Sequence, residues 1–147
     1  MFDSLLGQVC QLLFDPYLNL GLAKIAAAMA NKGSFDGKTV LSREAWEAMH
    51  ADPTDGILVN NSVKFTQGGV AQFEEEDRSE TNGRQGYYGW MGLGGSVFQW
   101  HPELRIGFGY APTLLTWIDL INNKARLLQG EVVKCARNVN SLTMRGL

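Results

Sequence analysis

The sequence has few of the residues that form metal sites or redox pairs. Its 147 residues include only two histidines, His50 and His101, and two cysteines, Cys10 and Cys135. The histidines are in neither HxxxH nor HExxH spacing, and the cysteines form no CxxC pair, so we expect no metal site and no redox motif. The cysteines are typical of reduced intracellular thiols, with a disulfide as the alternative.

An activated serine is also missing. None of the seven serines is followed by lysine three residues later, and none stands in Gly-x-Ser-x-Gly. The nearest match, at residues 94–98, lacks the final glycine. A serine needs a base within hydrogen-bond reach to attack at neutral pH. We therefore expect no catalytic residue in this chain.

Long apolar runs and excess charge are absent as well. No stretch approaches the roughly 20 apolar residues of a membrane span. The net charge of -2 and the lack of a basic, aromatic-rich patch argue against a nucleic-acid partner. Asp3 stands where a secretory signal would carry a basic residue. We expect a soluble chain, with the cytoplasm as the favoured compartment, and the sequence indicates no oligomeric state.

A nucleotide cofactor is not expected either. Residues 92–95 are glycine-rich, but Val97 replaces the third glycine of the dinucleotide fingerprint and no P-loop lysine follows. The sequence therefore predicts no cofactor.

Apolar residues recur at helical spacing in three N-terminal segments. Residues 5–13 predict a helix that ends before Pro16. A second helix is expected to begin at Asn19, its N-cap, and to end at Gly33. Residues 35–38 predict a turn, and Ser42 is expected to cap a third helix that stops before residues 52–53.

The second half of the chain predicts strands and one more helix. Residues 63–65 suggest a strand, Gly68 and Gly69 a turn or a bulge, and the acidic run 74–77 a solvated loop. Residues 96–110 predict an antiparallel hairpin with Pro102 in its turn. Its large side chains should lie on one face, and its glycines should allow close packing on the other. An apolar stripe predicts a last helix over residues 114–128, closed by Gly130.

Together these elements predict an α/β fold of the α+β type, an antiparallel sheet flanked by helices. The expected organisation is an N-terminal helical extension over residues 1–16, a main portion over 17–132 and a tail over 133–147. The hydrophobic share of 45% suits one core.

Two segments carry a family resemblance. Residues 19–33 read NLGLAKIAAAMANKG, followed by FDGK and LS, and residues 88–96 read YGWMGLGGS, followed by HPE and FGY. In this order they resemble the serine β-lactamase-like family, which includes class C β-lactamases, penicillin-binding proteins and related esterases. The resemblance covers residues 18–130 and implies the C-terminal part of such a β-lactamase/transpeptidase-like domain, incomplete without its N-terminal half.

The resemblance also implies where a substrate would bind. The family's Ser-x-x-Lys and Tyr-x-Asn motifs lie N-terminal to the matched region, and Tyr17 sits too close to the following helix to be the catalytic tyrosine. The third motif forms one wall of the acyl pocket, and the backbone just after it, at Leu93, would help to hold the oxyanion. The substrate-binding residues implied are Trp90, Met91, Gly92 and Leu93.

Trp90 departs from the β-lactamase pattern. β-Lactamases and transpeptidases carry Lys or His there, which would pair with a substrate carboxylate. An indole instead resembles the esterase-like branch, although a plain packing residue is the alternative. The sequence thus predicts a fragment of a hydrolase whose full-length parent cleaves small-molecule esters or amides through an acyl-serine. The fragment would be inactive alone, and the alternative is a non-catalytic interaction domain of the same fold.

Overall fold

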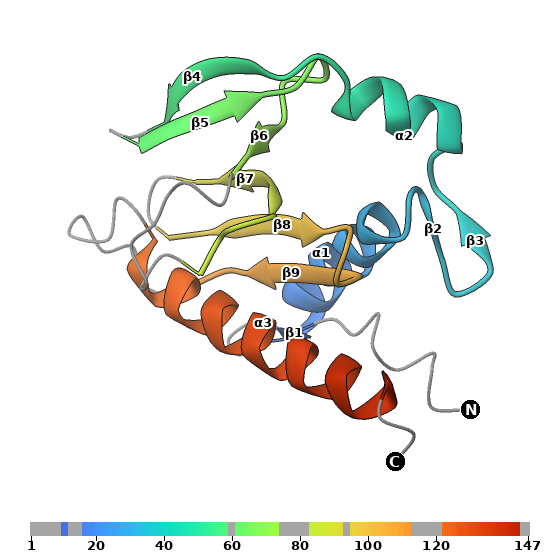
Figure 1. Cartoon of the computed structure of the whole chain (residues 1–147), viewed down its shortest axis with the longest axis vertical. Helices are drawn as coiled ribbons and strands as arrows, with labels where there is room; N and C mark the ends of the chain where they lie inside the picture. The colour runs from blue at the N-terminus through green and yellow to red at the C-terminus, as the bar shows by residue number, and fades with distance from the viewer. Residues whose placement is uncertain are drawn as a thin grey trace.

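The computed structural model describes residues 10–11, 16–58, 61–73, 83–92, 95–112 and 122–144. Over these residues the chain forms one large sheet with helices on both faces, and a small separate hairpin (Figure 1). The α+β prediction is confirmed at this level.

The large sheet is an antiparallel meander with one parallel strand at its edge. Its strands run from β4 (Thr54–Leu58) through β5 (Asn61–Phe65), β6 (Ala71–Gln72), β7 (Tyr88–Met91) and β8 (Val97–His101) to β9 (Ile106–Tyr110). Each of these strands pairs antiparallel with the next. β1 (Cys10–Gln11) pairs in parallel with β9, so the order is β1-β9-β8-β7-β6-β5-β4.

α1 (Pro16–Ala30) packs on one face of the sheet, against β8 and β9. A Cβ added to Gly107 would collide with the backbone of Ala26 and Ala27. Both alanines are fully buried. The glycine in the strand and the alanines in the helix therefore let the two backbones approach closely, as the glycine pattern of the hairpin predicts.

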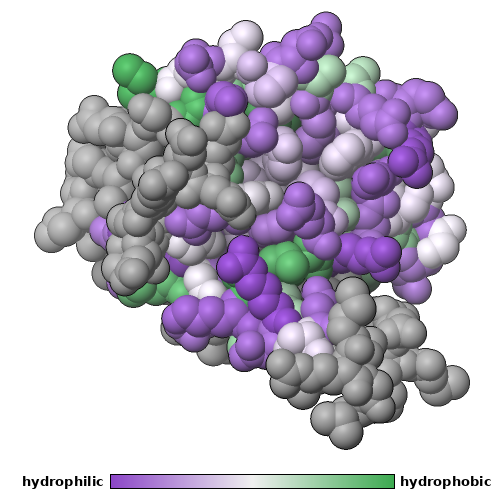
Figure 2. Space-filling model, viewed as in Figure 1, coloured by the Kyte–Doolittle hydropathy of each residue, from purple (hydrophilic) through white to green (hydrophobic). Residues whose placement is uncertain are grey.

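α3 (Asn123–Met144) covers the opposite face. Ile106, Phe108 and Tyr110 alternate with Gly107 and Gly109 along β9, so they point away from α1 and form the main core. The outer surface on the α3 side is mainly hydrophilic (Figure 2). The residues of α3 that close this core are Ala125, Leu128, Val132, Val133 and Ala136.

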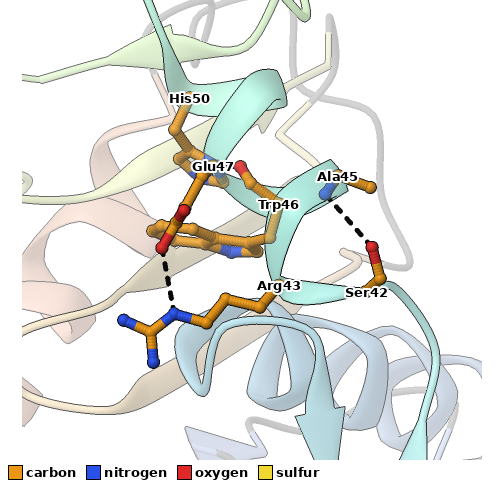
Figure 3. A network of polar contacts seen from close by, with 6 residues as sticks. All are labelled: Ser42, Arg43, Ala45, Trp46, Glu47 and His50. Atoms are coloured by element: carbon orange, nitrogen blue, oxygen red, sulfur yellow. Dashed lines mark hydrogen bonds and ion pairs between the residues drawn. The ribbon is translucent and has the colours of Figure 1, made fainter.

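The predicted turns and caps between α1 and β4 are confirmed. β2 (Ser34–Phe35) and β3 (Lys38–Thr39) form a hairpin in which Asp36 and Gly37 have φ values of 51° and 72°, as a type I′ turn requires. The Ser42 side chain accepts a hydrogen bond from the Ala45 N–H and caps α2 (Arg43–His50) (Figure 3). α2 packs through Trp46 into a second cluster with Met29, Ala30, Val70 and Trp100.

The N-terminal predictions need correction. Cys10 and Gln11 form β1, so the helix predicted over residues 5–13 is wrong at these two positions; its other residues lie outside the described part of the chain. α1 begins at Pro16 rather than after Asn19, because proline is well suited to the first helical position. The helix ends close to Gly33, whose N–H donates to the Ala28 carbonyl over 2.8 Å.

The C-terminal helix begins and ends later than predicted: Asn122, inside the predicted helix, has a φ of 53° and lies before α3, which begins at Asn123. Gly130 does not close α3; the helix continues to Met144, through most of the segment expected to be a tail. Gly83 packs closely on the helix here: a Cβ added to Gly83 would collide with the backbone of Arg126 and Gly130, whereas a Cβ added to Gly130 would meet the Gly83 Cα at an ordinary contact distance of 3.4 Å. Residues 113–121, at the start of the predicted helix, and the acidic run 74–77 lie outside the described residues.

Candidate functional site

β7 carries two of the predicted substrate-binding residues. Tyr88 and Gly89 pair with β6 on one side and with β8 on the other. Trp90 and Met91 pair with β8, but among the described strands they have no register partner on the β6 side. Among the described strands, the C-terminal half of β7 is therefore paired with β8 alone.

Trp90 presents its ring at the surface. Its side chain is 45% exposed. The ring centroid lies 5.9 Å from that of Phe65, with the planes tilted by 37°, and Trp90 is paired across the strands with Phe98. An exposed indole beside other aromatic rings offers a flat apolar surface with a polar N–H, which suits contact with a ligand or partner.

Met91 and Gly92, which follow Trp90 in the chain, differ from it in where they lie. Met91 pairs with the buried Val97 and packs against the main core, on the opposite face of the sheet from Trp90. Gly92 is exposed directly after β7, and Leu93 lies outside the described residues. Of the four predicted residues, the structure thus brings Trp90 and Gly92 to the surface and turns Met91 inward.

The turn after β7 uses its own backbone donors. The Gly92 N–H donates to the Ser96 carbonyl over 2.7 Å, and the Gly95 N–H donates to the Gly92 carbonyl over 3.2 Å. Gly95 has a φ of 107° and is buried against Pro112 and Asn122. Neither glycine N–H is therefore available to an oxyanion, and the expectation for Leu93 stays a prediction.

A buried polar network lies between the sheet and α3, next to β7. Arg84 donates from Nε to Gln129 Oε1 over 3.3 Å, and Gln129 donates from Nε2 to Gln99 Oε1 over 2.6 Å. Arg84 also donates from Nη2 to the Asn122 carbonyl over 3.3 Å. All four residues are at most 3% exposed. Gln99 is paired with Gly89, so the network ties the start of α3 to the strand pair that carries Trp90.

Sequence reasoning did not identify this network. Gln99 stands between Phe98 and Trp100 in an apolar strand, and Gln129 lies within the amphipathic pattern of the last helix. A glutamine at a position expected to face the core was the one available signal, because a buried amide needs a polar partner.

His50 lies at the end of α2, among aromatic rings. Its ring stacks on Trp46, with centroids 3.7 Å apart (Figure 3). Its Nδ1 lies 2.7 Å from the Trp46 carbonyl, and its Nε2 accepts from Trp100 Nε1 over 3.0 Å. Burial lowers the pKa of His50 below its usual 6.5, although the backbone bond to Trp46 opposes this.

His101 is a separate, buried histidine at the end of β8. The Leu104 N–H donates to its Nδ1 over 3.3 Å, and Tyr87 contacts it edge-on. Burial, and then the nearby charge of Arg137, lower its pKa to about 4. Within the described ranges, no three His, Cys, Asp or Glu residues come together as metal ligands. Cys135 is a free, exposed thiol on α3.

None of the described helices has the length and apolar character needed to cross a bilayer. Compared with models of protein families, with curated proteins and with solved structures, the chain finds no match. The resemblance to the serine β-lactamase-like family therefore remains a prediction from the sequence.

Proposed function

We propose that the chain is the C-terminal part of a β-lactamase-like serine hydrolase, in which the end of β7 forms one wall of the acyl pocket. The observation that supports this is the position of Trp90. Its ring is 45% exposed, whereas Trp100 on the neighbouring strand is 2% exposed. It also lies on the half of β7 that, among the described strands, pairs with β8 but not with β6, and an extended ligand can bind beside such a strand through main-chain hydrogen bonds.

The chemistry of this surface suits an uncharged acyl group. An indole offers apolar area and one N–H donor, but no cation to pair with a substrate carboxylate. Gly92 follows without a side chain, so a ligand can approach the backbone closely there. The parent enzyme would hydrolyse an ester or amide through an acyl-serine, with its nucleophile and base outside this chain.

The most direct test is to sequence the transcript upstream of the Met1 codon. An in-frame Ser-x-x-Lys, followed later by Tyr-x-Asn, is the expected result. Transcripts that code for neither motif upstream would overturn the hydrolase proposal.

A second test uses the longer product, if its motifs are found. Trp90→Ala should change the relative kcat/KM for short and bulky acyl esters and leave the melting temperature nearly unchanged, while Trp90→Phe, as the matched control, should keep most of the preference. A lowered melting temperature with an unchanged substrate profile would mean that Trp90 is a packing residue.

A non-catalytic interaction domain of the same fold is the second candidate. It is favoured by the absence of a nucleophile–base pair in the sequence and by exposed apolar side chains such as Ile57, which is 76% exposed on the edge strand β4. A purified chain that stays monodisperse, binds a protein partner and takes up no acyl probe would support it. A chain that aggregates on its own would favour the fragment.

A further inference from the structure

His50 connects α2 to the sheet through a hydrogen bond that requires one protonation state. Trp100 Nε1 can only donate, so His50 Nε2, 3.0 Å away, must be an unprotonated acceptor. His50 Nδ1 must then carry the proton and donate to the Trp46 carbonyl, 2.7 Å away. The two contacts together define a neutral ring with the proton on Nδ1.

The two aromatic side chains of α2 are attached to different elements. The Trp46 indole N–H donates to the Met29 carbonyl at the end of α1 over 2.8 Å. His50, one turn further along, links α2 to β8 through its side chain. The Met49 and Ala51 carbonyls at the same end of α2 accept backbone hydrogen bonds from residues 67–68, in the turn after β5. Loss of the His50 contact would leave these bonds and the Trp46 anchor in place and would free the His50 ring from β8.

We propose that His50 is a pH-sensitive contact: its neutral ring links α2 to β8 through Trp100, and protonation of Nε2 breaks this link. A proton from solvent would occupy Nε2, so two N–H groups would face each other where one hydrogen bond had been. Trp100 is 2% exposed, which leaves its N–H without access to water. This inference does not depend on the hydrolase proposal.

The surroundings of His50 offer little to stabilise a charged ring. On α2 itself the charged side chains are Arg43, Glu44 and Glu47; Arg43 and Glu47 are exposed and pair with each other over 2.9 Å. From the sheet, β7 contributes the ring of Tyr88, edge-on at 4.9 Å, and β8 contributes Trp100. α1 contributes Met29 to the cluster behind Trp46. The direction of the His50 pKa, lowered by burial, agrees with this environment.

Nuclear magnetic resonance of the wild-type chain tests the proposal directly. The ring signals of His50 and the indole N–H signal of Trp100 are followed from pH 8 to pH 4, with His101→Gln used to assign the two histidines. His50 should titrate below pH 6.5, and the Trp100 signal should move with the same midpoint. A Trp100 signal that does not follow His50 would overturn the proposal.

Trp100→Phe provides the second measurement. It removes the donor that requires a neutral ring, so the proton affinity of His50 should rise about fivefold, the equivalent of one ordinary hydrogen bond. Trp90→Phe is the matched control, because it removes an indole that does not contact His50, and it should leave the midpoint unchanged. An unchanged midpoint in Trp100→Phe would also overturn the proposal, and if that variant fails to fold, the wild-type titration decides alone.

Discussion

The structure describes the surroundings of Trp46, Trp90 and Trp100, and these three side chains differ in how far they are buried. Trp46 and Trp100 are 9% and 2% exposed and lie in the cluster between α1, α2 and the sheet, whereas Trp90 is 45% exposed. Trp46 and Trp100 also use their indole N–H groups in buried hydrogen bonds. The same residue type is therefore structural at two positions and available for binding at the third.

The difference in burial predicts how much stability the chain loses when each tryptophan is replaced by alanine. Trp46→Ala should lower the free energy of unfolding by about 3–5 kcal/mol, because it empties a buried site. Trp90→Ala should cost about 1 kcal/mol or less, because half of its surface is already in water. Urea unfolding followed by circular dichroism measures both. Equal losses in the two variants would count against a binding role for Trp90.

The lowered pKa of His101 predicts that the folded chain becomes less stable in acid. Its pKa in the folded chain is about 4, below the ordinary 6.5, so the unfolded chain binds the proton more readily. Stability should be constant above about pH 6.5 and should fall as the pH drops toward 4, by at most about 3 kcal/mol from this residue. His50, whose pKa is also lowered, acts in the same direction.

The measurement is the urea midpoint at several pH values between 4 and 8. His101→Gln removes the titrating ring, so its stability should depend less on pH than that of the wild type. Parallel pH profiles for the two proteins would show that another group causes the acid sensitivity.

Short-range signals at the level of elements predict the turns and caps well. Asp36 and Gly37 specify the hairpin turn, Ser42 specifies the start of α2, and the alternation in residues 97–110 specifies the β8–β9 hairpin and its glycine face. In each case the residues that form the feature are neighbours in sequence, so local stereochemistry is enough.

The sequence does not predict features that depend on partners far away along the chain. The start of β4 reads Thr-Asp-Gly, which has little strand propensity, and the strand exists because it pairs with β5. Gly130 resembles a helix end in the sequence, but it lies inside α3, at the place where Gly83 packs against the helix backbone. The sequence predicts both Trp90 and Met91 as site residues, but the inward position of Met91 depends on which face of the sheet α3 covers.

Gly107, in the α1–β9 contact, and Gly21, on the exposed side of α1, predict opposite effects of substitution by alanine. Gly107→Ala places a methyl group against the backbone of Ala26 and Ala27, so it should lower stability by about 1–3 kcal/mol. Gly21, within α1, has nothing within 4 Å of an added Cβ, so Gly21→Ala should raise stability by about 0.5–1 kcal/mol. Thermal unfolding of both variants tests the contact. A neutral Gly107→Ala would mean that α1 can move away from the sheet without cost.

For the whole molecule, the two edges of the sheet differ. Among the described strands, β4 is outermost at one edge, while at the other edge β9 is covered by the two residues of β1. Deleting residues 1–11 should expose the backbone groups of β9, which favours pairing with another chain. The deletion variant should unfold at lower denaturant concentration, and its apparent mass in gel filtration should rise with protein concentration.

A double substitution of Cys10 and Gln11 by alanine is the matched control, because it keeps the backbone that pairs with β9. It should remain close to wild type in both measurements. A deletion variant that stays monomeric at every concentration would show that β1 does not protect this edge.

The parallel pairing of β1 with β9 also determines the order in which the chain can be assembled. From β4 to β9, each strand pairs with the next one in sequence, so these contacts close short loops and can form quickly. Cys10 and Phe108, which pair in β1 and β9, are about 100 residues apart. During synthesis β1 leaves the ribosome first, yet its partner strand is among the last to emerge. The segment that begins the sheet in sequence is therefore the last to join it in time.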